Sequence, residues 1–180
     1  MANKIKIGIS ACLLGKPVRY DGENGHAHFL TDAFGKDIEW VPVCPEVEFG
    51  LSVPREEMRL YGNQDSPRLI TVNTTLDHTE GLKKWARKKI RDLESENLCG
   101  FIFKSKSPSC GLNGVNIYSL AGKHIGKGAG LFAEGFTKNF PLIPVESEER
   151  LYDQTIRDNF IKKVFTFFKD RRTSDVDRRP

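Results

Sequence analysis

Four cysteines are the residues of this 180-residue sequence with the most distinctive chemistry. Cys12, Cys44 and Cys110 are separated by tens of residues, unlike the closely spaced pairs of zinc fingers and ferredoxins. A metal site made from them must therefore be assembled by the fold. Three thiolates hold either a zinc ion with one open position or a [4Fe-4S] cluster in which one iron lacks a protein ligand. A third interpretation, which the spacing leaves open, is that the cysteines are buried core residues.

Each of these three cysteines comes after a segment that the sequence predicts to be a buried strand. Residues 4–10 place isoleucines on one face, residues 38–43 are rich in β-branched residues, and residues 100–104 form a short apolar run. Turn-forming residues follow each segment. The remaining cysteine, Cys99, precedes the third strand, which places it on the order of 15 Å from the opposite strand ends. We expect the other three cysteines at one sheet edge and Cys99 elsewhere.

Two amphipathic helices complete the pattern. Residues 82–93 carry apolar side chains at helical spacing and basic side chains on the other face, and a second helix extends from Asp153, its N-cap, to residue 168. Segments 115–119 and 142–145 are further candidate strands. The fold class is therefore α/β, with a mostly parallel Rossmann-like sheet flanked by helices and a C-terminal helix. Ligands of such sheets bind beyond the carboxyl ends of the strands.

Composition indicates a globular chain. Hydrophobic residues make up 38%, and 28 basic against 24 acidic residues give a net charge of +4, which suits an anionic small molecule as well as nucleic acid. Because no apolar run is long enough to span a bilayer and no secretion signal is present, we expect a cytoplasmic protein that does not bind membranes and keeps its thiols reduced. We divide the chain into a domain at 1–145, a helical extension at 146–169 and a disordered tail at 170–180.

Four sequence blocks resemble, in order, the signature blocks of a known family. They are residues 10–22 (SACLLGKPVRYDG), 44–55 (CPEVEFGLSVPR), 104–111 (KSKSPSCG) and 128–133 (GAGLFA). The family is DUF523, whose characterised members are thiouracil desulfidases of the TudS type, and the resemblance covers residues 4–145. Residues 146–168 further resemble the junction at which longer relatives continue into a DUF1722 domain.

The resemblance implies a [4Fe-4S] cluster held by Cys12, Cys44 and Cys110, whereas Cys99 has no counterpart. It also implies non-redox removal of sulfur from 4-thiouracil, 4-thiouridine or its monophosphate, which gives the oxo base and sulfide. In such a reaction the open iron supplies Lewis-acid chemistry at the sulfur. A cluster open at one iron is sensitive to oxygen, so aerobic preparation is expected to remove it.

Five polar residues of the matching blocks are candidates for work on the substrate. We assign Glu46 to acid–base catalysis and Ser107 to a second catalytic role, because both lie within reach of a cysteine along the chain. Ser109, Arg55 and Arg19 are assigned to substrate binding. The alternatives are a surface carboxylate for Glu46, turn formation for the serines and structural ion pairs for the arginines.

The expected partner is a small thiolated pyrimidine or nucleotide, with tRNA as a second candidate. The basic face of the helix at 82–93 suits RNA phosphates, although such a face is usually only solvated. A non-catalytic iron–sulfur sensor or RNA-binding module is therefore the rival function. The phenylalanines of the C-terminal helix either pack on the domain, in a monomer, or form a homodimer interface.

Overall fold

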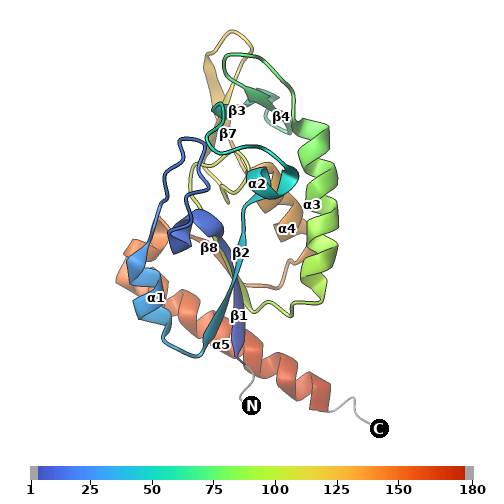
Figure 1. Ribbon diagram of the computed structural model, residues 1–180. Coiled ribbons are helices and arrows are strands. Elements are labelled where there is room, and N and C mark those ends of the chain that lie inside the picture. Colours follow the sequence, from blue (N-terminus) through green and yellow to red (C-terminus); the bar gives the residue numbers. More distant parts are fainter. Residues whose placement is uncertain (1–3, 177–180) are drawn as a thin grey trace.

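A central parallel sheet organises the protein, of which a computed structural model describes residues 4–176. Its strand order is β2-β1-β5-β8, and all neighbouring strands are parallel (Figure 1). The bounds are β1 Ile5–Ser10, β2 Ile38–Val43, β5 Gly100–Phe103 and β8 Val145–Ser147. Every residue of β5 is buried, as expected for a strand covered on both faces. The predicted α/β class and parallel sheet are confirmed.

Helices cover both faces of this sheet. Helices α1 (His28–Phe34) and α5 (Gln154–Val176) contribute to a core cluster with the isoleucines of β1. Helices α3 (Thr79–Glu94) and α4 (Leu131–Asn139) contribute to the cluster of the other face. There Phe101 and Phe103 stack with ring centroids 4.2 Å apart and meet the phenylalanines of α4. Two aromatic and aliphatic layers thus hold the strands in place.

Gly8 is the one position of β1 where this packing requires a glycine. A Cβ added at Gly8 would lie 2.2 Å from Cδ2 of Phe101 on the neighbouring strand. The Phe101 ring therefore occupies the space beside the β1 backbone. This close contact aligns β1 and β5, the two strands from which Cys12 and Cys110 follow.

A second, four-stranded sheet was only partly predicted from the sequence. Its order is β4-β3-β6-β7, with β3 parallel to β6 and the other pairs antiparallel. The bounds are β3 Met58–Asn63, β4 Ser66–Thr71, β6 Val115–Tyr118 and β7 His124–Gly128. The sequence predicted β6 alone. The sheet packs through Leu60 and Leu69 against Leu82 of α3, and it forms the upper part of the molecule in Figure 1.

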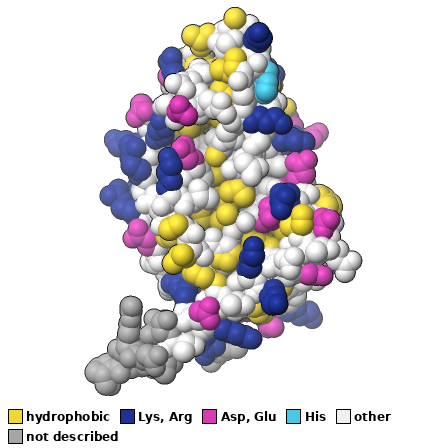
Figure 2. All heavy atoms as spheres, turned by 180° about the vertical axis from the view of Figure 1, so that it is seen from behind, with side chains coloured by type: hydrophobic (Ala, Val, Ile, Leu, Met, Phe, Trp, Pro, Cys, Tyr) yellow, Lys and Arg dark blue, Asp and Glu magenta, His cyan; other side chains and the backbone are white. Residues whose placement is uncertain are grey.

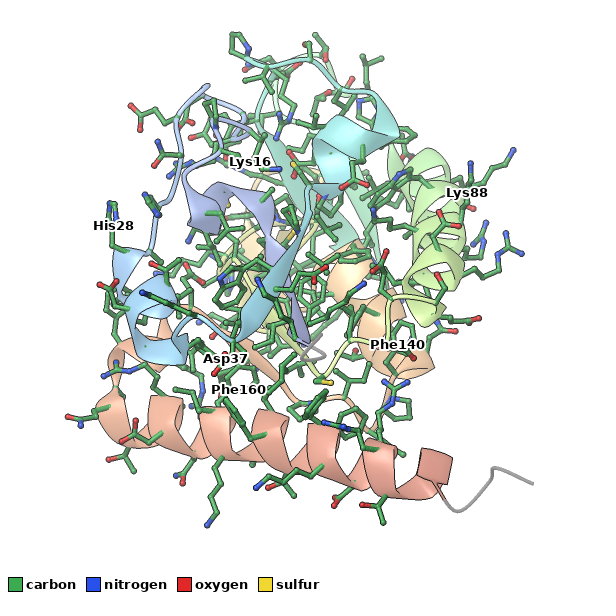
Figure 3. The ribbon with its side chains drawn as sticks, turned by 60° about the horizontal axis from the view of Figure 1, so that its bottom comes forward. Lys16, His28, Asp37, Lys88, Phe140 and Phe160 are labelled. Atoms are coloured by element: carbon green, nitrogen blue, oxygen red, sulfur yellow. The ribbon has the colours of Figure 1, made fainter. Side chains whose placement is uncertain are left out.

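Helix α5 begins as predicted and ends later. Asp153 accepts a hydrogen bond from the backbone N–H of Ile156 at 3.0 Å, which confirms the N-cap. In Figure 3 the helix runs across the bottom of the molecule, and its Phe160, which is 3% exposed, points toward the sheet. The prediction of disorder from residue 170 is wrong as far as Val176, because the helix continues to that residue. Arg171 donates to the carbonyl of Leu98 and so ties this part of the helix to the domain, whereas residues 177–180 lie outside the described chain.

Three short helices complete the fold. They are η1 (Ala11–Leu14), α2 (Pro45–Phe49) and η2 (Arg150–Tyr152). The first two follow β1 and β2 directly and begin at the carboxyl edge of the central sheet. Within the described residues, no helix has the length and apolar character needed to cross a membrane.

Candidate functional site

A cavity of about 580 Å³ lies at the carboxyl edge of the central sheet. One wall consists of the segments that follow β1, β2 and β5, and residues of β3 and β6 form another wall. The second sheet therefore closes the space above the strand ends. Its volume lies in the range that pockets for small organic ligands occupy, roughly 300–1,000 Å³.

The three predicted cysteines all line this cavity. Cys12 lies in η1 after β1, Cys44 is the residue before α2, and Cys110 lies in the loop after β5. All are free thiols. Burial raises the pKa of the Cys12 thiol to about 11, and it also raises the pKa of Cys44 and Cys110. Free thiols with raised pKa values are protonated at neutral pH. Binding a metal as thiolates must therefore release protons.

The donors that line this cavity are rich in sulfur. Across residues 4–176, no three His, Cys, Asp or Glu side chains are close enough together to hold one metal ion. In a [4Fe-4S] cluster each thiolate binds a different iron, so its ligands surround a wider object. Soft thiolates select zinc as well as iron–sulfur clusters, so the three cavity cysteines suit either group by donor type.

Cys99 lies away from the cavity, as its place before β5 predicted. It is 3% exposed and belongs to the core cluster of α1 and α5. Its backbone N–H donates to the carbonyl of Lys6 at 2.8 Å, and its thiol contacts the carbonyl of Asn97 at 3.6 Å. Cys99 therefore serves as an internal comparison for the three cavity cysteines.

Glu46 is the carboxylate that the fold fixes most firmly in the cavity wall. It lies in the first turn of α2, two residues after Cys44, and is 9% exposed. Its Oε1 accepts a hydrogen bond from the Ser109 hydroxyl at 2.8 Å, and its Oε2 accepts one from Arg55 Nε at 2.8 Å. Arg55 also donates to the carbonyl of Val18 at 2.9 Å. The carboxylate is thus held from two sides and faces the cavity with little freedom to rotate.

The two serines beside Cys110 occupy different environments. Ser107 lines the cavity, and its hydroxyl oxygen accepts hydrogen bonds from the backbone N–H groups of Ser109 and Cys110 at 3.3 and 3.0 Å. Its own proton is therefore free to be donated toward the cavity. Ser109 is completely buried behind Glu46 and is not one of the lining residues. Ser109 and Arg55 thus contact Glu46 in this structure.

Arg19 lines the cavity at its rim, where its Nη2 lies 2.9 Å from Oδ2 of Asp21. Its side chain is 35% exposed, so the guanidinium is open to solvent on one side. Among the predicted arginines it is the more accessible one, because only 8% of the Arg55 side chain is exposed.

Residues 128–133 pack against the loop after β5 that carries Cys110. A Cβ at Gly130 would lie 2.6 Å from the backbone carbon of Ser109, so the two segments touch. The N–H groups of Leu131 and Phe132, at the start of α4, donate to the carbonyls of Pro108 and Ser109. The glycines therefore permit close packing at this turn, and the loop that carries Cys110 is fixed on the helix N-terminus.

Sequence reasoning missed three polar residues at this edge: Ser10, Lys104 and Glu148. Ser10 ends β1, Lys104 follows β5 directly, and Glu148 follows β8 directly. Position relative to the strand ends was the available signal, since it had located the cysteines in the same way.

The family model for 2-thiouracil desulfurase matches residues 7–148, which include all three cavity cysteines. The chain belongs to this family. A solved structure of a [4Fe-4S]-dependent thiouracil desulfidase, TudS, is 31% identical and superimposes with a TM-score of 0.66 over 87% of this chain and 99% of its own. YbbK of Bacillus subtilis (strain 168), an uncharacterized protein, is 29% identical over 134 residues, which cover 69% of this chain and 85% of YbbK. The DUF523 resemblance is thereby confirmed, and the junction to a DUF1722 domain stays a prediction.

Proposed function

We propose that this family member is a [4Fe-4S]-dependent desulfidase that replaces the sulfur of a thiouracil-type base by oxygen from water. The carrying observation is the convergence of three free thiols from three strand ends on one cavity, beside a carboxylate held in its wall. The likeness to TudS, a [4Fe-4S]-dependent thiouracil desulfidase, supports the same assignment.

Cys12, Cys44 and Cys110 would hold the cluster, and a bound cluster supplies Lewis-acid chemistry toward sulfur at an iron that has no protein ligand. A thiocarbonyl bond resists hydrolysis unless the leaving sulfur is stabilised. The protein itself must orient the base, position a water molecule at the carbon that bears sulfur and transfer two protons.

Glu46 is the proposed acid–base residue. Its carboxylate faces the cavity and accepts a proton from the attacking water, which adds to the carbon that bears sulfur. Glu46 returns this proton to the sulfur of the adduct and then takes the proton of the added hydroxyl as the C–S bond breaks and the carbonyl forms. The sulfur leaves as hydrosulfide, which takes the last proton from Glu46. Water and thiocarbonyl are converted to carbonyl and hydrogen sulfide, so no electrons are gained or lost. Ser109 and Arg55 keep the carboxylate directed at the cavity throughout.

Ser107 is the proposed hydrogen-bond donor to the substrate. Its oxygen is already occupied as an acceptor, so its proton is available for the carbonyl oxygen or ring nitrogen of the base. We assign Arg19 to an anionic group at the rim, because its guanidinium is partly exposed there.

The charge of the cavity wall favours an anionic nucleotide such as 4-thiouridine monophosphate over the free base. Among the lining residues, six basic side chains face two carboxylates. They are Arg19, Arg55, Arg59, Lys104, Lys106 and Lys127 against Glu46 and Glu57. Arg55 and Arg59 pair with these two carboxylates, and carboxylates outside the lining pair with Arg19, Lys104 and Lys106. The partly exposed Arg19 and the exposed Lys127 are therefore the groups that we propose for a phosphate.

Isotope labelling tests the reaction. Protein that has been loaded with the cluster under argon is given 4-thiouridine monophosphate in ¹⁸O-labelled water without any reductant. We expect uridine monophosphate that carries the heavy oxygen, with one sulfide released for each base. Unlabelled product, or turnover that requires a reductant, would contradict the hydrolytic reaction. Tight, salt-sensitive binding of thiolated tRNA without sulfide release would instead support the RNA-binding module.

That rival has one observation in its favour. Lys84, Arg87, Lys88 and Arg91 are exposed on α3, and Figure 2 shows basic side chains gathered along this edge of the molecule, while Figure 3 shows Lys88 directed away from the core. None of these four residues lines the cavity. The basic face and the thiols are therefore separate features, and the thiols carry the proposal.

A further inference from the structure

The second sheet presents one of its two faces to the cavity. In β6, Val115 and Ile117 are buried in the core beside α3, and the alternate residues Asn116 and Tyr118 line the cavity. Asn116 is the register partner of Lys127 in β7, and Lys127 also lines the cavity. Because directly paired residues lie on the same face of a sheet, polar and aromatic side chains of two neighbouring strands meet on this wall.

The ring of Tyr118 is held by three neighbours. The guanidinium carbon of Arg59, on β3, lies 5.3 Å from the centroid of the ring. The ring centroids of Tyr61 and His124, on the strands to either side of β6, lie 6.1 and 6.0 Å from that of Tyr118. Contacts of a ring with cations and other aromatic rings stabilise one orientation of that ring. The Tyr118 side chain is therefore positioned in the wall before a ligand binds.

The polar atoms of Tyr118 and Asn116 form a complementary pair. Nδ2 of Asn116 donates to the hydroxyl oxygen of Tyr118 at 3.4 Å. The tyrosine oxygen is thus occupied as an acceptor, and its proton is available to a ligand. Within residues 4–176, Oδ1 of Asn116 accepts no hydrogen bond and can accept one from a ligand. A donor and an acceptor on adjacent side chains suit the two neighbouring hydroxyls of a ribose, each of which donates and accepts.

The geometry of the base determines which wall meets the ribose. In 4-thiouridine, the carbon that bears sulfur and the nitrogen that bears ribose lie on opposite sides of the six-membered ring. A base whose sulfur points at Cys12, Cys44 and Cys110 therefore directs its ribose away from the strand ends of the central sheet. Residues of β3 and β6 form the wall above these strand ends (Figure 1). Such a base directs its ribose at the wall that carries Asn116 and Tyr118.

We propose that Tyr118 and Asn116 recognise the ribose of a 4-thiouridine nucleotide, and that the second sheet thereby selects nucleosides and nucleotides over the free base. Lys127, opposite Asn116 on β7, then lies beside the ribose and meets the phosphate that extends from it. The inference rests on the proposed function, because the reaction fixes the direction of the sulfur. It assigns substrate selection to the second sheet and the chemistry to the central sheet.

Kinetics of the cluster-loaded protein with three substrates test the recognition of ribose. Tyr118→Phe removes only the hydroxyl, and Asn116→Ala removes the amide. Each variant should lower kcat/KM for 4-thiouridine and for its monophosphate by roughly three- to tenfold, through a higher KM, as loss of one hydrogen bond to a neutral group does. Neither should change kcat/KM for free 4-thiouracil, which has no ribose. An equal loss with the free base would indicate a structural effect and would overturn the inference.

Lys127 and Tyr61 provide matched controls. Lys127→Met should lower kcat/KM only for the monophosphate, because 4-thiouridine carries no phosphate. Tyr61 is the register partner of Tyr118 on β3, but it is not among the residues that line the cavity. Tyr61→Phe is therefore expected to leave kcat/KM unchanged for all three substrates. A loss in Tyr61→Phe as large as that in Tyr118→Phe would show that the effect does not come from the cavity wall and would overturn the assignment.

Titration calorimetry of the purified protein, with or without the cluster, gives a readout that needs no turnover. Uridine monophosphate should bind more tightly than 2′-deoxyuridine monophosphate, which lacks one of the two hydroxyls. Tyr118→Phe and Asn116→Ala should reduce this preference, whereas Tyr61→Phe should retain it. Equal affinity of the unmodified protein for the two nucleotides would overturn the recognition of the ribose. Should the protein bind no cluster or release no sulfide, the proposed function fails, while these affinities still decide the role of Tyr118 and Asn116.

Discussion

Single residues carry the chemistry, and two cysteines allow a matched comparison. Cys110 and Cys99 are both buried, at 6% and 3% exposed, but only Cys110 lines the cavity. Cys110→Ala should abolish cluster binding and sulfide release, whereas Cys99→Ala should retain both, with at most a small loss of stability from a buried sulfur. Iron content and the visible absorption of anaerobically loaded protein measure the difference. An active Cys110→Ala variant would remove this cysteine from the site.

Glu46 provides a second residue-scale prediction. Glu46→Gln retains the shape of the side chain and an oxygen for Ser109, but it loses the base and the ion pair with Arg55. We expect the cluster absorption to remain and kcat to fall by about a hundredfold or more, the usual contribution of a general base. Unchanged kcat would exclude Glu46 from proton transfer.

Ser109→Ala distinguishes orientation of the Glu46 carboxylate from proton transfer by that carboxylate. Removal of its hydroxyl leaves Oε1 of Glu46 without its buried donor, which costs roughly 1–3 kcal/mol of stability and lets the carboxylate turn. We expect kcat to fall less than in Glu46→Gln and KM to change little, because Ser109 is buried away from the cavity surface. A large rise in KM with constant kcat would instead support the direct substrate contact first expected for Ser109.

At the scale of elements, the start of α3 gives a pH-dependent prediction. Burial tends to raise the pKa of the Asp77 carboxyl, but hydrogen bonds from Thr79 and the Arg68 guanidinium outweigh it and lower the pKa to about 2. A lowered pKa stabilises the folded state above the ordinary range of an aspartate, and this contribution is lost as pH falls toward 2.

Asp77→Asn should therefore reduce the free energy of unfolding by about 1 kcal/mol at neutral pH, because Asn keeps an oxygen for Thr79 but loses the solvent-screened charge beside Arg68, and the difference should shrink in acid. Urea unfolding at several pH values measures it. Glu80→Gln, on the same helix with a side chain 83% exposed, is the control and should change little at any pH. A constant difference for Asp77→Asn from neutral to acid pH would contradict the lowered pKa.

Helix α5 is expected to be part of the folded core. Phe160 and Val164 are 3% and 0% exposed and belong to one cluster with the isoleucines of β1. Phe160→Ala should reduce the free energy of unfolding by roughly 3–5 kcal/mol. The alternative is that the phenylalanines of this helix form a homodimer interface, and a loss below about 1 kcal/mol by urea unfolding would favour it.

The sequence predicted the central sheet correctly where a hydrophobic pattern is typical of a single kind of element. Alternation in residues 4–10 and the apolar run at 100–104 predict buried strands, and strand ends of a parallel sheet meet at one edge, so the cysteines could be brought together without coordinates. The second sheet was largely missed although β3 and β4 are as long as β1, because polar residues and Pro67 interrupt their apolar pattern. In β7, no residue of His124–Gly128 is buried, so hydrophobic alternation gives no signal there.

Side-chain contacts within the site were the other part that sequence reasoning could not supply. Ser107 and Ser109 are two residues apart in one turn, yet one lines the cavity and the other is buried behind Glu46. Arg55 is likewise turned into the wall by Glu46 and the carbonyl of Val18. Such choices depend on packing between segments that are distant in sequence, and they leave no mark in local spacing.

For the whole molecule, the two sheets have different tasks. The central sheet brings Cys12, Cys44 and Cys110 to one edge, and the second sheet closes the cavity above them with β3 and β6 (Figure 1). The cavity wall carries six basic side chains, most of them ion-paired, and we propose that Arg19 and Lys127 among them meet the phosphate of a nucleotide. We therefore propose that one cavity holds both the three cysteines and an anionic substrate.

The most direct test is to measure iron and acid-labile sulfide in anaerobically purified protein and then to add 4-thiouridine monophosphate in the same tube. We expect about four irons per chain, as one [4Fe-4S] cluster requires, followed by release of sulfide from the nucleotide. A cluster without sulfide release would favour the sensor or RNA-binding module. Zinc in place of iron would contradict the proposed chemistry itself.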